Sequence, residues 1–140
     1  MNAEEAIKLC RFVKAACPQQ AIDEYTPDAW LVLLEPYRFE DCRQAAVDLA
    51  RAEPFVAPAE IIQRVKAIRG KRIAEFGPIE PPPEVTSGQR DYREWFIETR
   101  TAIGDGILKP EPREIDRAAR ERLDRMIEGT FRDIDEDEDD

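Results

Sequence analysis

The chain contains no histidine among its 140 residues. Histidine is a common general acid or base in enzymes and the commonest metal ligand in proteins, so its absence removes the usual routes to both kinds of site. The sequence also lacks a glycine-rich phosphate loop, a serine nucleophile elbow and a CxxC pair. We therefore expect a protein that is not an enzyme and that has no cofactor and no metal.

Cysteine is scarce, and its spacing fits no zinc pattern. The three residues are Cys10, Cys17 and Cys42, an odd number. Cys10 and Cys17 lie on the apolar stripe of the first predicted helix, where free cysteine behaves as a small buried hydrophobe. We expect all three to be buried and reduced, with a redox or nucleophilic role as the alternative.

Long apolar runs are also absent. No stretch approaches the roughly 20 apolar residues that a membrane span needs, and the N-terminus, Met1-Asn2-Ala3-Glu4-Glu5, carries no basic leader. The sequence therefore predicts a soluble intracellular protein that does not engage a membrane.

Residues 1–76 contain the pattern of four helices separated by prolines. Asn2 is a predicted cap for a helix to about Ala16, and Thr26-Pro27 caps and opens a second helix that Pro36 stops. A third helix is expected from about Phe39 to Ala52, and a fourth from Pro58. No segment alternates with period two, so the predicted fold class is all-α with these apolar stripes as the core.

The character of the chain changes after Phe76. Residues 77–88 are rich in proline and are predicted to be a semi-extended linker that is neither helix nor central strand. Residues 89–131 are predicted to be an amphipathic helical segment, with helices over about 89–103 and 113–128. Residues 132–140 form an acidic tail, with seven acids in the last eight residues, and such a run is typical of disorder.

The fourth predicted helix has a basic second half. Two arginines, Arg69 and Arg72, fall within the same arc as the apolar residues of its first half. A core cannot bury unpaired guanidiniums, so they either project from the protein or meet acids from a partner or from elsewhere in the chain. The candidate basic surface consists of Arg64, Lys66, Arg69, Lys71 and Arg72. Such a surface can bind phosphates, but the net charge of −10 makes any DNA contact weak or indirect.

The segment after the linker carries a cluster of large aromatic side chains. Tyr92, Trp95 and Phe96 lie within five residues on one amphipathic helix, a composition typical of an interface anchor. The alternative is that this helix folds back onto the first domain and completes its core. The candidate partner-binding residues are Tyr92, Trp95, Phe96, Ile103, Leu123 and Met126.

Several short segments are similar to those of a family of small phage proteins. They are Asn2-Ala3-Glu4-Glu5-Ala6, Thr26-Pro27-Asp28-Ala29-Trp30, Phe39-Glu40-Asp41-Cys42 and Val56-Ala57-Pro58-Ala59-Glu60-Ile61. Over residues 1–75 the chain resembles the bacteriophage replicative helicase loader and inhibitor family. Tyr92-Arg93-Glu94-Trp95 and Ala102-Ile103-Gly104-Asp105-Gly106 are similar to the downstream segment of such proteins.

The resemblance implies a non-enzymatic adaptor in the cytoplasm of a bacterial host cell. It would load or inhibit a DnaB-type hexameric helicase in phage DNA replication, with a phage initiator protein as a further partner. The acidic tail and the aromatic helix depart from the family pattern. The alternative function is a DNA-binding or DNA-packaging accessory protein that uses the basic end of the fourth helix.

Overall fold

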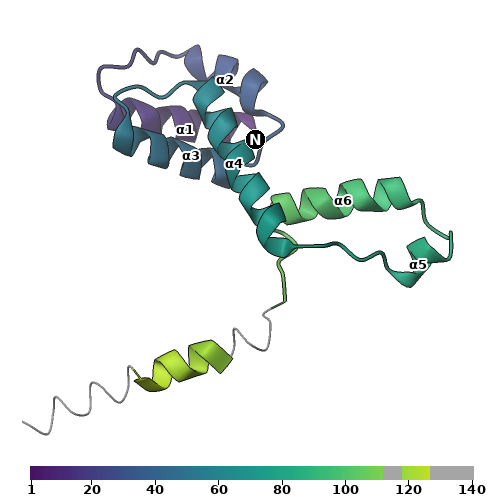
Figure 1. The fold of residues 1–140 in the computed structure, drawn as a ribbon. Helices are drawn as coiled ribbons and strands as arrows, with labels where there is room; N and C mark the ends of the chain where they lie inside the picture. Colours follow the sequence, from purple (N-terminus) through teal and green to yellow (C-terminus); the bar gives the residue numbers. More distant parts are fainter. Residues whose placement is uncertain (112–117, 127–140) are drawn as a thin grey trace, which may run out of the picture. The chain divides into compact units, whose positions relative to one another are not determined.

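The computed structural model describes residues 1–111 and 118–126, and all secondary structure in these ranges is helical. This confirms the predicted all-α class (Figure 1). The elements are α1 (Ala3–Ala16), α2 (Thr26–Leu34), α3 (Phe39–Ala52), α4 (Pro58–Phe76), α5 (Pro83–Thr86) and α6 (Tyr92–Gly104). The predicted acidic tail, 132–140, lies outside the described residues.

The helix ends follow from local side-chain chemistry. The side chain of Asn2 accepts from the backbone of Glu5, and the Glu5 carboxylate accepts from the backbone of Asn2, which is a complete capping box at α1. Pro58 opens α4 at a position where its missing N–H costs nothing. The predicted Thr26 cap of α2 is wrong, because Tyr25 occupies that position. The Asp23 carboxylate instead accepts from the backbone of Tyr25 and Thr26.

The first four helices form what we call the helical domain, residues 1–76. Helix α1 packs against α2 and α3, and α4 packs against α3 and α2. All three cysteines lie in the core that these contacts enclose, as the sequence predicts. The fully buried members of this core are Leu9, Cys10, Val13, Cys17, Trp30, Leu34, Cys42, Ala45, Ala46, Val56, Ile61 and Val65.

Residues 77–109, which we call the arm, follow α4 and return to it. The predicted linker contains one short helix, α5, because Pro83 supplies a helix-compatible φ at the first helical position. Helix α6 then packs against both α5 and α4. Figure 1 shows the C-terminal end of α6 at α4, with α5 at the other end of α6.

The chain divides into two units, residues 1–109 and residues 110–140. In the second unit, residues 118–126 are helical, which agrees with part of the helix expected over 113–128. The remainder of that expected helix lies outside the described residues.

Candidate functional site: the arm and the arginines that hold it

Arg72 joins three parts of the chain. Its terminal nitrogens lie 2.7 and 3.0 Å from the two carboxylate oxygens of Asp41, in the first turn of α3. Nη1 also donates to the carbonyl oxygen of Gly104, the last residue of α6, at 2.8 Å. Asp41 is buried, so the guanidinium supplies the compensating charge that a buried carboxylate requires. This two-pronged geometry suits the planar fork of arginine and not the point charge of lysine.

Two further arginines bind the residue after α6. Arg69, nearly one turn before Arg72 on α4, pairs with the carboxylate of Asp105. Arg38, just before α3, donates to the backbone carbonyl of Asp105. We call the six residues Arg38, Asp41, Arg69, Arg72, Gly104 and Asp105 the arginine clamp.

The C-terminal end of α6 has the backbone geometry and the partial charge to accept hydrogen bonds from the arginines of the clamp. Helix α6 ends in a Schellman motif, in which the amide of Gly106 donates to Ile103 and the amide of Ile107 donates to Ala102. Gly106 has the positive φ, 73°, that this motif requires. The last carbonyls of a helix carry partial negative charge, so guanidiniums there are favourably placed. The arginine clamp therefore fixes α6 by its C-terminal end.

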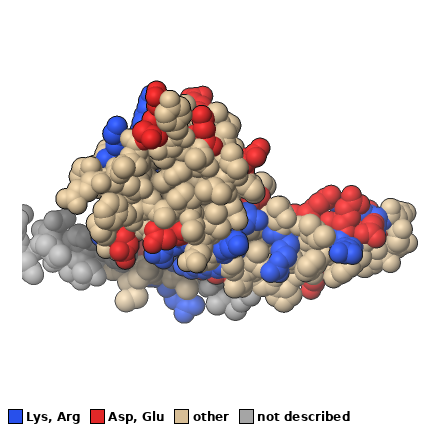
Figure 2. All heavy atoms as spheres, turned by 90° about the horizontal axis from the view of Figure 1, so that it is seen from above, with Lys and Arg blue, Asp and Glu red and all other residues tan. Residues whose placement is uncertain are grey.

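Two of the five predicted basic-surface residues are members of the arginine clamp. Arg69 and Arg72 meet acids from elsewhere in the chain, which was one of the possibilities the sequence left open. Arg64, Lys66 and Lys71 are exposed on α4. Figure 2 shows lysine and arginine side chains gathered where the helical domain meets the arm.

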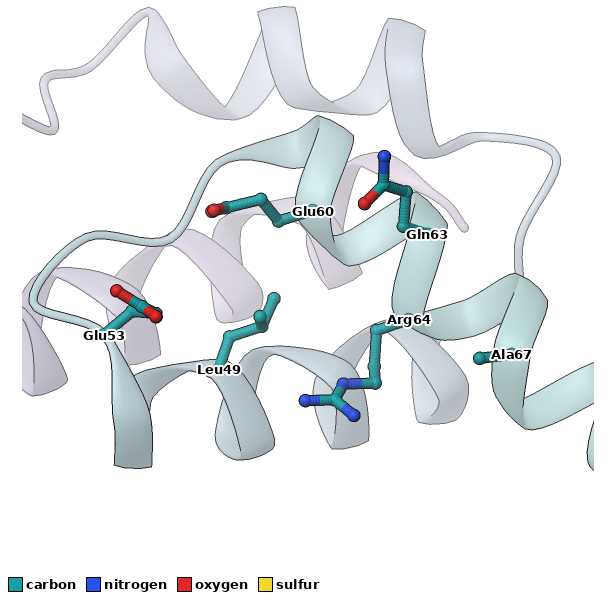
Figure 3. A pocket seen from close by; sticks show the side chains of 6 residues that line it. All are labelled: Leu49, Glu53, Glu60, Gln63, Arg64 and Ala67. Carbon is teal, nitrogen blue, oxygen red and sulfur yellow. The ribbon is translucent and has the colours of Figure 1, made fainter.

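Arg64 also borders an open groove of about 310 Å³ between α3 and α4. Figure 3 shows Glu60 on α4, which also carries Arg64, and Glu53 at the end of α3 across the groove. Glu60 already accepts from the backbone amide of Ala57, at 3.0 Å. Because the lining contains both charge signs, the groove favours neither an anion nor a cation. Its lining residues are Leu49, Glu53, Glu60, Gln63, Arg64 and Ala67.

The predicted aromatic cluster forms, but its members differ in exposure. Trp95 is buried in the arm, as is Val85 of α5, and neither belongs to the core of the helical domain. The rings of Tyr92 and Phe96 stack with centroids 6.0 Å apart, and Tyr92 is 55% exposed. Ile97 is 54% exposed on the same helix. The most exposed apolar side chains of α6 are therefore Tyr92 and Ile97, which lie about 140° apart around the helix axis, with Phe96 half-buried.

The other predicted partner-binding residues belong to other parts of the chain. Ile103 is buried near the C-terminal end of α6, where Gly104 is held in the clamp. Leu123 and Met126 are exposed in the helical residues 118–126 of the second unit. The structure thus brings Tyr92, Trp95 and Phe96 together. The acidic members of the clamp, Asp41 and Asp105, were not singled out from the sequence.

The described residues offer little reactive chemistry. Burial raises the pKa of Cys10 and that of Cys42 to about 11, which keeps both thiols protonated at neutral pH. No group of His, Cys, Asp and Glu side chains in the described part of the chain could hold a metal ion. In the same ranges, no helix has the length and apolar character to cross a membrane.

Comparison with known proteins gives no family for the chain. It matches no protein-family model, no curated protein and no solved structure. The resemblance of residues 1–75 to phage helicase loaders thus rests on the short segments quoted above.

Proposed function

We propose that this chain is an adaptor that binds a partner protein through the arm. We further propose that the partner is a DnaB-type hexameric helicase, which the adaptor loads or inhibits during phage DNA replication. The resemblance of residues 1–75 supports the choice of helicase, and the geometry of the arm supports the choice of surface.

The observation that carries the proposal is the exposed Tyr92 ring in the first turn of α6. Tyr92 is more than half exposed and is stacked on Phe96, and Ile97 is exposed on a different side of the same helix. Large aromatic side chains are enriched among the residues that dominate binding energy at protein interfaces. Because the arginine clamp already fixes the other end of α6, little freedom remains to be lost when a partner binds.

The alternative, DNA binding by the basic end of α4, has less support. Arg69 and Arg72 are engaged with Asp41 and Asp105, so they are not available to phosphates unless the clamp opens. Each phosphate neutralised by a lysine or arginine contributes to affinity. Only Arg64, Lys66 and Lys71 then remain for that role.

The test is a calorimetric titration of a purified DnaB-type hexameric helicase with the full chain and its variants. The double substitution Tyr92→Ser with Ile97→Ser should cost at least about 2 kcal/mol of binding, near thirtyfold in affinity. Phe55→Ser is the matched control, because Phe55 is a similarly exposed apolar residue of the helical domain. Equal affinity for the double variant and the wild type would refute the arm as the binding site.

Trp95→Ala has a different expected effect. Trp95 is buried, so its loss should reduce the helical content of the arm as well as the affinity, and circular dichroism separates the two effects. If no variant of the chain binds the helicase, the proposed partner is wrong. Duplex DNA binding that Lys66→Gln and Lys71→Gln weaken would then favour the alternative.

A further inference from the structure

Helix α2 is apolar on both of its sides. Trp30 and Leu34 are buried in the core of the helical domain, and this side is explained by packing. On the other side, Val32 is 76% exposed and Leu33 is 52% exposed. A helix that is apolar all round is normally buried, so an exposed one requires a reason.

The exposed apolar residues form one continuous stripe. Within α2, Ala29, Val32 and Leu33 follow at i, i+3 and i+4, the spacing of a single helical side, and Tyr25 and Pro36 flank the two ends of the helix. At 1.5 Å per residue the nine residues of α2 span about 14 Å, or more than two turns of a partner helix. We call the stripe with its flanking residues the α2 face; it consists of Tyr25, Ala29, Val32, Leu33 and Pro36, all exposed.

The charged residues that belong to α2 and its flanking turns have one sign. Every charged residue between Lys14 and Arg38 is acidic, and these are Asp23, Glu24, Asp28 and Glu35, all exposed. Figure 2, which looks down on the side of Figure 1 where α2 lies, shows a broad area without charged side chains, with acidic groups along parts of its edge and basic groups along others. An acidic border attracts a basic partner and repels polyanions such as nucleic acid or anionic lipid.

We infer that the α2 face is a docking site for a helix of another protein, one whose apolar stripe is flanked by lysine and arginine. Apolar contact supplies the affinity, and the acidic border selects the charge of the partner and its orientation. This site is separate from the one proposed on the arm, since it uses only the helical domain. An adaptor with both surfaces can hold two proteins at once.

The probe is an 18-residue designed helix made of leucine and lysine, with a leucine and glutamate peptide of the same pattern as its control. Binding to the full chain is measured by calorimetry at low and high salt. We expect the lysine peptide to bind with a Kd in the micromolar range, more weakly as salt rises, and the glutamate peptide not to bind.

Two variants locate the site. Val32→Ser with Leu33→Ser should weaken lysine-peptide binding at least tenfold, whereas Tyr92→Ser with Ile97→Ser on the arm should leave it unchanged. Both pairs are exposed, so circular dichroism should show intact folds. Glu24→Gln with Asp28→Asn should remove most of the salt dependence.

Three results would overturn the inference. The first is equal binding of the lysine peptide to the wild type and to the Val32 and Leu33 variant. The second is equal binding of both peptides, because the border would then select nothing. The third is a dimer of the wild-type chain, detected by sedimentation and abolished by the Val32 and Leu33 substitutions, since the occupant would then be a second copy.

Discussion

Replacing Arg72 by methionine tests whether the arginine clamp holds the arm on the helical domain. Methionine keeps an apolar stem of similar length but removes two hydrogen bonds to Asp41 and one to Gly104. Removing one partner of a buried charge pair costs roughly 3–5 kcal/mol, because the other charge is left uncompensated. Since the Arg72 side chain is 34% exposed, water can replace part of the interaction, and we expect a loss of about 2–4 kcal/mol.

The assay is urea unfolding of the full chain, followed by tryptophan fluorescence and circular dichroism. One tryptophan, Trp30, lies in the core of the helical domain, and the other, Trp95, lies in the arm. Hydrogen exchange at the amides of Ile107 and Leu108, which bond to Ala102, reports the end of α6 directly. Arg72→Met should lower the free energy of unfolding and speed exchange at both amides.

Lys71→Met is the matched control for this prediction. Lys71 is exposed and pairs only loosely with Glu75, at 3.8 Å, so its loss should change stability by less than about 0.5 kcal/mol. Asp41→Leu combined with Arg72→Leu should recover part of the loss, because no uncompensated charge remains. If Arg72→Met behaves like Lys71→Met, the clamp does not stabilise the protein and our reasoning is wrong.

Further predictions concern the core and two glycines. Because burial raises the pKa of Cys10 and Cys42 from 9.0 to about 11, stability should fall by about 2–3 kcal/mol per thiol between pH 9 and pH 11, as measured by urea unfolding against pH; a flat profile over this range would contradict it. Trp30→Ala should cost about 3–5 kcal/mol in the same assay, whereas an effect below 1 kcal/mol would place the ring outside the core. Gly70→Ala should raise the melting temperature by the equivalent of about 0.5–1 kcal/mol, since nothing lies within 4 Å of the added methyl group. Gly106→Ala should lower it, because φ is +73° and Arg72 is 3.4 Å from the added methyl group; a change of the same sign for both substitutions would contradict this reasoning.

The helices of the helical domain could be predicted because their ends are decided locally. The Asn2 capping box and Pro58 act on their own turns, and the prediction for 39–52 agrees with α3 (Phe39–Ala52). Helix α5 was missed from the sequence because the proline-rich composition of residues 77–88 predicts an extended linker. The position of Pro83, as the first residue of a helix, is a weaker signal in the opposite direction. The Thr26 cap was misassigned because Asp23, three residues earlier, binds Thr26 itself: its carboxylate accepts from both the amide and the hydroxyl group of Thr26.

The clamp could be predicted only in part. The sequence shows that Arg69 and Arg72 cannot enter a core unpaired, so a need for acids followed from the helical pattern alone. The acids that meet this need are 31 and 36 residues away in the chain, and no local signal marks them among the acidic residues of the sequence. Asp41 in particular has the sequence context of an ordinary first-turn acid of α3.

Arg72 contacts both the helical domain and the arm. The same guanidinium binds the carboxylate of Asp41 in the domain and donates to the carbonyl oxygen of Gly104 in the arm. If α6 is pulled away, Arg72 still covers the buried carboxylate of Asp41, and the domain keeps its charge balance. If Arg72 leaves, both contacts fail together. The pair with Asp41 therefore acts within the helical domain alone, whereas the bond to Gly104 acts together with the two bonds to Asp105 in holding the arm.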